Sequence, residues 1–337
     1  MRATDGVGLA LLAGFLLLPL VVAEWVAGDL AIYFAYALLA VSLGFVWGHC
    51  GLLSLGHAVF FGLGAYAMSV TTMGRLPGLP DLHSTWAGLA LAVALPALVA
   101  YVVGWFFFFA RGLHGAFFGI VTLALAYIFE RSAINWSWLG GLNGMLGVPP
   151  INLGLNGDGT DVWDPLPLYY VAFAVLALAI AGLTWIGRSD FGVALAAIRE
   201  NELRCRALGY DVSRMKVRAY TLGGAVAGLG GALFVVQFNF ASPALIGFSL
   251  SAEALIWVAV GGRGSLVAAA CGALVVKIAE AQLSSLLGVW WPLVIGALFM
   301  LCVLALPRGL FGALIHGLAA GVERLRARRS PLAARDP

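Results

Sequence analysis

Residues 188–218 read RSDFGVALAAIRENELRCRALGYDVSRMKVR, the longest polar interval in a chain that is otherwise mostly apolar. The stretch from Ala194 to Leu208 has helical propensity, and Gly209 follows where a glycine commonly ends a helix. The interval therefore predicts an amphipathic helix between two apolar parts of the chain. The apolar contacts of this helix are expected from Val193, Ala196, Ala197, Ile198 and Leu203.

The composition of the whole chain is that of an integral membrane protein. Of its 337 residues, 62% are hydrophobic and only 10% are charged, whereas a soluble domain carries about 25% charged residues. Such a chain has too few polar side chains to cover a surface that faces water. We therefore predict an all-α, polytopic membrane domain over residues 1–306, which includes the polar loop 187–218, and a basic tail over 307–337.

Ten apolar segments can be marked along the chain. Several exceed the roughly 18 apolar residues that indicate a membrane helix. The segment 251–262 is too short to cross a bilayer at about 1.5 Å per residue, and glycines interrupt the segment 53–72. The sequence therefore predicts eight to ten transmembrane helices. The ten segments are 7–23, 30–47, 53–72, 86–109, 113–136, 167–186, 219–240, 251–262, 266–287 and 289–306.

The positions of the basic residues predict how these helices are oriented, because arginine and lysine concentrate in cytoplasmic loops. Basic residues occur in the polar interval, at Arg111 and Arg263, and in the tail, whereas the loop 137–166 has three aspartates and no basic residue. Ten spans taken in order place the basic regions on one side and the acidic loop on the other. We predict that the polar interval and the C-terminus are cytoplasmic, with the tail near anionic lipid. Nucleic-acid binding is not expected, because the basic run is short and adjoins a membrane span.

Small residues on 219–240 predict close helix packing. Gly223, Ala227 and Gly231 form one series at a spacing of four, and Gly224 and Gly228 form another. Residues at this spacing lie along one side of a helix and let a neighbouring helix approach closely.

Two groups of polar residues are predicted at membrane depth, where such residues are costly and often functional. The stretch SLGHAVF over 54–60 places a serine and a histidine among apolar residues, so Ser54, Gly56, His57 and Phe60 are candidates for lining a translocation pathway. The alternative is that a backbone carbonyl satisfies the histidine. Lys277 and Glu280 are three residues apart, so that a helix would make them neighbours able to neutralise each other.

The chain lacks the sequence motifs of an ATPase or another enzyme. No G-x-x-x-x-G-K-[ST] phosphate loop occurs, and the two lysines, Lys216 and Lys277, have no such context. The four cysteines have no metal-binding spacing. If ATP drives transport, it must be bound by partner chains, and no cofactor of this chain's own is expected. The helix in the polar interval could lie on lipid, pack on its own chain, or dock in a partner's groove.

Four stretches together resemble one family of transport proteins. They are GLLSLGHAVFFGLGAYA (51–67), AAIRENELRCRALGYDVSRMKVRAYTLGGAVAGLGGALF (196–234), SPALIGFSLSAEALIWVAVGGRGSL (242–266) and LPRGLFG (306–312). This chain is similar in these stretches to the permease subunits of branched-chain amino-acid ABC importers and to the related urea importers. The resemblance implies that the polar interval docks onto an ATPase. The residues that would form this coupling segment are Arg199, Glu200, Asn201, Ala207, Leu208 and Gly209.

The resemblance also implies an assembly in the bacterial inner membrane. Its other members would be a homologous second permease, two ATPase subunits and an extracytoplasmic substrate-binding protein. EALIWVAVGGRGSL (253–266) and GGLNG (140–144) look closer to the urea branch, so both branched-chain amino acids and urea or short amides stay open as substrates. The alternatives are an ion-coupled secondary transporter or channel, which would need more buried ionisable groups, and an intramembrane enzyme, which would need a convergent polar site.

Overall fold

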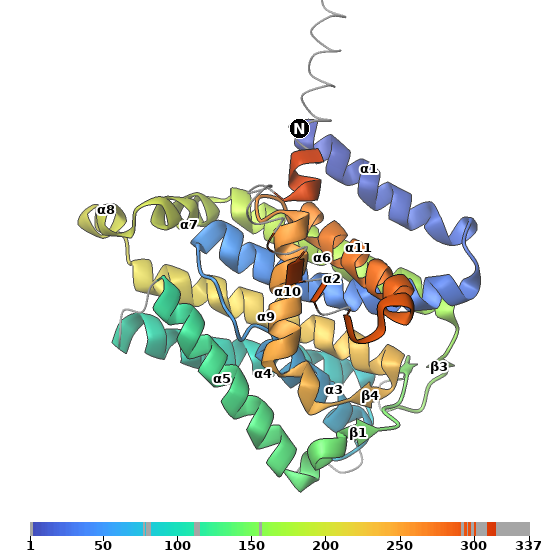
Figure 1. Cartoon of the computed structure of the whole chain (residues 1–337). Coiled ribbons are helices and arrows are strands. Elements are labelled where there is room, and N and C mark those ends of the chain that lie inside the picture. The colour runs from blue at the N-terminus through green and yellow to red at the C-terminus, as the bar shows by residue number, and fades with distance from the viewer. Residues whose placement is uncertain are drawn as a thin grey trace, which may run out of the picture.

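The computed structural model describes residues 3–76, 78, 82–110, 115–154, 157–290 and the short pieces 293–294, 296–297, 300 and 309–314. Arg111, Cys302, most of the segment 289–306 and the basic tail beyond 314 lie outside the described residues. The chain is built almost wholly of helices (Figure 1). These helices are α1 (Ala3–Leu17), α2 (Glu24–Cys50), α3 (Ala58–Thr72), α4 (Thr85–Trp105), α5 (Ala116–Asn135), α6 (Pro165–Arg188), α7 (Asp190–Glu200), α8 (Glu202–Ala207), α9 (Val212–Phe238), α10 (Phe248–Gly261) and α11 (Leu266–Leu287).

The all-α fold and the positions of nine of the ten predicted apolar segments are confirmed. Among the described residues, six helices, α2, α4, α5, α6, α9 and α11, are long and apolar enough to cross a membrane, while Gly6–Leu20, α3 and α10 are shorter apolar helices. The prediction for the third segment was wrong at its start, because helix α3 begins at Ala58 and the residues 51–54 are not helical.

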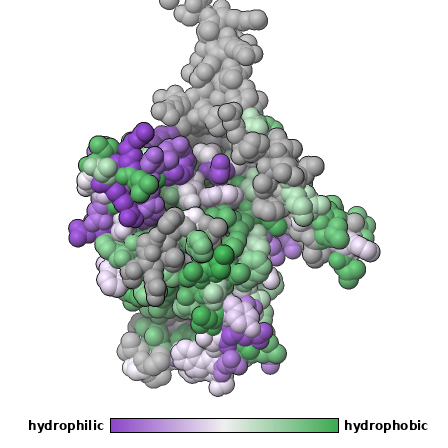
Figure 2. Space-filling model, turned by 60° about the vertical axis from the view of Figure 1, so that its left-hand side comes forward, coloured by the Kyte–Doolittle hydropathy of each residue, from purple (hydrophilic) through white to green (hydrophobic). Residues whose placement is uncertain are grey.

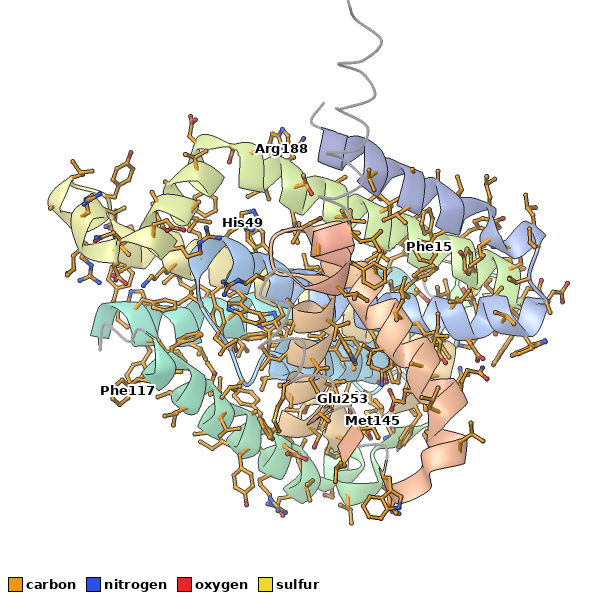
Figure 3. All side chains as sticks on the ribbon, turned by 45° about the horizontal axis from the view of Figure 1, so that its top comes forward. Phe15, His49, Phe117, Met145, Arg188 and Glu253 are labelled. Atoms are coloured by element: carbon orange, nitrogen blue, oxygen red, sulfur yellow. The ribbon has the colours of Figure 1, made fainter. Side chains whose placement is uncertain are left out.

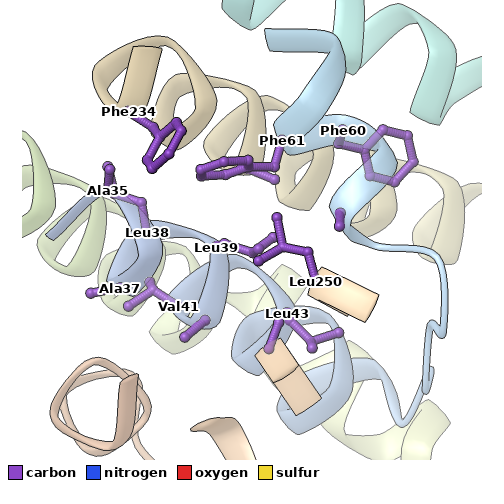
Figure 4. Close-up of a cluster of buried hydrophobic side chains, with 14 of the residues drawn as sticks. Ala35, Ala37, Leu38, Leu39, Val41, Leu43, Phe60, Phe61, Phe234 and Leu250 are labelled. Carbon is purple, nitrogen blue, oxygen red and sulfur yellow. The ribbon is translucent and has the colours of Figure 1, made fainter. Parts of the chain in front are cut away.

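The centre of the bundle is formed by α2 and α9, the most buried of the six long helices. Large apolar side chains of α2 meet Phe60 and Phe61 of α3 and Phe234 of α9 in one continuous core (Figure 4). Tyr36 stacks on Phe61 with ring centroids 5.9 Å apart. The two central helices are therefore in contact with almost every other part of the fold.

Helix α9 packs closely on its neighbours because several of its glycines meet their backbone directly. A Cβ added at Gly228 would overlap the carbonyl oxygen of Ala92 in α4, and a Cβ added at Gly64 of α3 would overlap the backbone of Gly228 itself. A Cβ at Gly231 would overlap the carbonyl oxygen of Phe61. The predicted packing role of the small-residue series is therefore confirmed.

The peptide between α2 and α3 is a non-helical insertion into the bundle. Helix α2 ends at Gly51, which has φ of +70°. Beyond it, the backbone N–H of Leu55 donates to Thr122 Oγ1 of α5 over 3.0 Å, and the N–H of Ala58 donates to Ser251 Oγ of α10 over 3.0 Å. Irregular backbone among membrane helices is stable only when protein or water satisfies it, and here side chains from two distant helices do so.

Contacts at the helix ends place the polar interval and the acidic loop at opposite ends of the bundle. Ser213 Oγ, within the interval, donates to the carbonyl of Phe108 over 3.1 Å, and Arg263 lies 5.8 Å from the ring of Trp47. At the other end of α9, strand β4 (Phe240–Ala241) pairs with β1 (Met145–Leu146) in the acidic loop. The remaining two strands, β2 (Ile151–Asn152) and β3 (Asp161–Val162), pair within that loop.

The surface has the same two-ended arrangement. Hydrophilic residues gather at the upper left and at the bottom of Figure 2, with apolar surface between them. The prediction that the polar interval and Arg263 share one end is confirmed. That this end faces the cytoplasm stays a prediction.

Candidate functional site

The polar interval forms two helices, α7 and α8, rather than the single helix predicted from the sequence. The backbone breaks at Asn201, which has φ of −155° and ψ of 95°, and its side chain accepts a hydrogen bond from the N–H of Arg204 over 2.9 Å. Asparagine favours such a cap because its side chain competes with the backbone for hydrogen bonds. The predicted stop at Gly209 is confirmed, since this glycine has φ of +89°.

A small apolar cluster holds the two short helices to the start of α9. It consists of Ile198 of α7, Cys205 of α8 and Val212 of α9, with Met215 packed against it. The break at Asn201 turns α8 so that Cys205 points inward. For this reason Leu203, which was predicted to face inward, is exposed instead, as is Val193.

Arg199 ties the end of α7 to the end of α2. Its Nη1 donates to the carbonyl oxygen of Gly48, in the last turn of α2, and its Nη2 forms an ion pair with Glu200 over 2.8 Å. A Cβ at Gly51 would lie 2.8 Å from Arg199 Cγ. Gly51 therefore provides space for the arginine as well as the left-handed turn that ends α2.

Glu202 ties α8 to α9 in a similar way. Its Oε2 lies 2.5 Å from Lys216 Nζ of α9, and its Oε1 lies 2.7 Å from Arg206 Nη2. Partial burial acts to raise the pKa of the Glu202 carboxyl, but the hydrogen bonds and charges of Lys216 and Arg206 outweigh it, so this pKa lies below its ordinary value. Arg199 and Glu202 thus connect α7 and α8 to the two central helices of the bundle.

The Glu202 tie predicts how stability depends on pH. Its contribution to the free energy of unfolding should be present at neutral pH and should be lost as the pH falls through the lowered pKa, because the protonated carboxyl no longer attracts Lys216. Glu202→Gln should therefore cost about 1 kcal/mol at neutral pH and reduce the loss of stability on acidification. The measurement is the thermal unfolding midpoint of the purified protein, taken from neutral pH down through the pKa of the Glu202 carboxyl.

Glu200→Gln is the matched control, because the Glu200 side chain is 73% exposed and lies outside this tie. The unfolding midpoint of this variant should depend on pH as it does in the parent protein. A Glu202→Gln variant that loses stability on acidification as steeply as the parent would contradict the tie.

The outer side of α7 and α8 carries exposed apolar residues among charges. Leu203 and Leu208 are 79% and 71% exposed, and Tyr210 is exposed beside them. All six predicted coupling residues, Arg199, Glu200, Asn201, Ala207, Leu208 and Gly209, are exposed in the same region. One of them, Arg199, is also bonded to α2. Sequence reasoning missed Leu203 and Tyr210, because their exposure depends on the break at Asn201.

The four predicted pathway residues lie inside the helix bundle. His57 Nε2 and Ser42 Oγ are 2.6 Å apart, and Ser42 Oγ donates to the carbonyl of Gly223 over 2.6 Å. Because the serine has one proton and gives it to Gly223, Nε2 of His57 must be the donor to Ser42. The histidine is thus satisfied through a hydroxyl, not directly by a backbone carbonyl as the alternative suggested.

The neighbours of His57 are equally enclosed. A Cβ at Gly56 would overlap the carbonyl oxygen of Thr122, and Phe60 packs edge-on against Tyr220 with centroids 5.2 Å apart. Ser54 Oγ, His57 Nδ1 and the Tyr220 hydroxyl have no hydrogen-bond partner among the described residues. Whether these groups line a pathway stays a prediction.

The predicted pairing of Lys277 with Glu280 is confirmed. Lys277 Nζ lies 2.8 Å from Glu280 Oε2, and it also lies 3.1 Å from Glu253 Oε2 of α10. The second carboxylate is 24 residues away along the chain, so the folding of α10 against α11 brings it into the group.

Comparison with known proteins identifies the family. A sequence model of the family described as branched-chain amino acid transport system / permease component matches residues 28–304. The chain belongs to this family. The permease is 30% identical over 295 residues to the high-affinity branched-chain amino acid transport system permease protein LivM of Escherichia coli K12, which covers 82% of this chain and 67% of LivM.

Two other relatives show the range of the similarity. The corresponding protein BraD of Pseudomonas aeruginosa is 24% identical over 285 residues, or 82% of the permease and 91% of BraD. The autoinducer 2 import system permease protein LsrC of Klebsiella pneumoniae is 32% identical over 151 residues, or 43% of the permease and 44% of LsrC. No solved structure matches the chain. The permease is thus a multi-pass membrane subunit of an ABC importer.

Proposed function

We propose that this permease carries branched-chain amino acids into the cell across the bacterial inner membrane. It would form the pathway with a homologous second permease, receive substrate from an extracytoplasmic binding protein, and be driven by two ATPase subunits. The observation that carries this proposal is the pair α7–α8, a charged and partly apolar projection tied to both central helices. The family match over residues 28–304 supports the transport role.

Coupling to the ATPases rests on the exposed surface of α7 and α8. Leu203, Leu208 and Tyr210 present exposed apolar groups among charged residues at the polar end of the bundle. Glu200 and Asn201 stand beside them as polar partners at the rim. An apolar centre with a polar rim is the ordinary composition of a protein interface, and a groove on the ATPase is the occupant that we propose.

Two ties would transmit the movement of the ATPases. Arg199 connects α7 to α2, and the Glu202–Lys216 pair connects α8 to α9. Because α9 packs closely on α2, with Gly223 against the Val46 side chain and Gly230 against the Ala35 carbonyl, a shift of the projection would move them as one rigid body. This movement would open the pathway alternately to the two sides of the membrane.

ATP itself would be bound by the partner subunits. Both lysines of the chain are engaged with carboxylates, Lys216 with Glu202 and Lys277 with Glu253 and Glu280. In this arrangement the projection and the C-terminus lie in the cytoplasm, and the tail arginines lie near anionic lipid.

The substrate is the part of the proposal that depends most on the relatives. LivM and BraD are named as branched-chain amino acid permeases, whereas LsrC is named for autoinducer 2. The similarity to the first two covers most of this chain, and the similarity to LsrC covers less than half. We therefore favour a branched-chain amino acid over urea or a short amide.

The proposal predicts ATP-dependent uptake of leucine. The permease should be reconstituted in liposomes with its homologous permease, ATPases and binding protein, and loaded with radiolabelled leucine or urea on the binding-protein side. Leucine should accumulate only with ATP, and an ATPase variant that cannot hydrolyse ATP should abolish uptake. Accumulation of urea instead would overturn the substrate, and uptake driven by an ion gradient without ATP would favour a secondary transporter.

A further inference from the structure

The most unusual group in the molecule is an ion triad formed where α2, α10 and α11 meet. Lys277 Nζ lies between the carboxylates of Glu253 and Glu280, at 3.1 and 2.8 Å. It also lies 4.5 Å from the centre of the Tyr36 ring and 5.2 Å from that of Trp257. Aromatic faces attract such a cation, so the ammonium group is held on two sides by rings and on two sides by carboxylates.

The triad stands at membrane depth. Lys277 is the twelfth of the 22 residues of α11, and Tyr36 is the thirteenth of the 27 residues of α2. Both helices are long and apolar enough to span the membrane. Charged groups at the middle of a span are rare, and they face either the interior of a bundle or a water-filled cavity.

The carboxylates reach the surface of the chain while the lysine does not. The side chain of Lys277 is 11% exposed, but those of Glu253 and Glu280 are 35% and 30% exposed. With two carboxylates and one ammonium group, the triad has a formal charge of −1. Within the described part of the chain no second cation contacts these carboxylates, so unbalanced negative charge is exposed near the middle of α11.

The surface around Glu253 differs from the faces that suit lipid. After Phe248, which is exposed in its first turn, the less buried side of α10 carries Ser249, Ala252, Glu253, Ile256 and Ala259. The exposed faces of α4, α5, α6 and α11 instead carry large apolar residues, which are Leu98, Tyr101, Val102, Trp105, Phe117, Ile120, Tyr127, Ile128, Val171, Leu178, Trp185, Val275, Ile278, Leu283 and Leu286. Figure 3 shows Glu253 on α10 near the middle of the molecule. The mostly small and polar residues around Glu253 indicate that this side of α10 does not face lipid.

We propose that this side of α10 is a wall of the aqueous translocation pathway, and that the unbalanced carboxylate meets the ammonium group of a passing zwitterionic amino acid. The inference rests on the transport function proposed above. A dry contact with the second permease is the competing arrangement. It would bury a carboxylate without a counter-charge, which is unfavourable unless a partner group compensates it, whereas a water-filled pathway leaves it hydrated.

Thiol accessibility tests the pathway independently of the substrate. In a variant with all four native cysteines replaced, Ala252→Cys and Ile256→Cys place a thiol on the proposed wall. Leu178→Cys and Leu98→Cys place one at similar depth on exposed apolar faces of α6 and α4. A cationic, membrane-impermeant methanethiosulfonate reagent would be applied to the assembled transporter in liposomes.

The α10 thiols should react at least about tenfold faster than the α6 and α4 thiols, because the thiolate, which forms in water and not in lipid, is the species that attacks the reagent's sulfur and releases methanesulfinate. Reaction should also block uptake. Equal, slow reaction at all four positions would overturn the pathway. The rate of thiol reaction does not depend on which substrate is transported. A failure of this test can therefore be distinguished from a failure of the proposed leucine transport.

Neutralising one carboxylate at a time tests the ammonium contact. Glu253→Gln and Glu280→Gln each keep one ion pair with Lys277 and remove the net negative charge. Each should lower the maximal rate of leucine uptake about three- to fivefold, which corresponds to the free energy of one solvated ion pair. Thermal stability and ATPase binding should be unchanged. If neither variant changes the uptake rate while the α10 thiols still react, the ammonium contact is overturned and the pathway is kept.

Discussion

Replacing Leu203 and Leu208 together with aspartate should abolish both ATPase binding and uptake while the membrane domain stays folded. The two leucines are largely exposed, so their loss leaves no cavity in the fold. Apolar residues at the centre of an interface can each contribute about 2 kcal/mol or more to binding, and aspartate would add a desolvation cost. The measurements are co-purification of the ATPases with the permease and ATP-dependent uptake in liposomes.

Leu142→Asp is the matched control for this prediction, because Leu142 is equally exposed but belongs to the acidic loop at the opposite end. It should leave ATPase binding unchanged. If the double aspartate variant still co-purified with the ATPases in full amount, α8 would not be their docking site.

Arg199→Ala should separate docking from transmission. It removes the tie between α7 and α2 but leaves the exposed leucines of α8 in place. ATPase binding should therefore persist while ATP-dependent uptake falls. A variant that loses binding and uptake together would instead assign Arg199 to the docking surface itself.

Gly228→Leu should prevent the membrane domain from folding. Its side chain would overlap the carbonyl oxygen of Ala92, and Gly64 of α3 already lies against the Gly228 backbone. Overpacking a core commonly costs about 1 to 3 kcal/mol, and backbone cannot move aside as a side chain can. We expect a loss above this range, seen as the absence of monodisperse protein after extraction from the membrane.

Gly182→Leu is the matched control, because it makes the same change in helix propensity as Gly228→Leu. Gly182 also lies within a membrane helix, α6, but no atom lies within 4 Å of a Cβ placed there. This variant should fold and unfold at the same temperature as the parent. Similar yields of monodisperse protein from the two variants would contradict the close packing of α3, α4 and α9.

Apolar length and residue spacing were enough to predict most of the fold. The long spans follow from runs of apolar residues, and the spacing of Gly224 and Gly228 by four indicated the close approach of α9 to α4. The approach of Lys277 and Glu280 likewise follows from helical spacing alone. In each case the deciding contact is either local in sequence or repeats with the helical period.

The features that sequence reasoning missed depend on contacts that are distant in sequence. Glu253 joins Lys277 only because α10 packs on α11. The first residues of the segment 53–72 are apolar and would suit a helix, but the N–H of Leu55 is held instead by Thr122 of α5. The break in the polar interval is different, because the cap at Asn201 is made with Arg204, only three residues away. Asparagine at that position was the local signal for the break that turns Leu203 outward.

The extended peptide after Gly51 has a consequence for how the protein is made. Its backbone donors find their acceptors on Thr122 and Ser251, so the second acceptor is synthesised almost 200 residues after the peptide itself. A nascent chain that has not yet reached α10 must hold the amide of Ala58 away from hydrocarbon by other means, such as water or the insertion machinery. The hydrogen bonds of this peptide are therefore complete only when the second half of the protein has been translated.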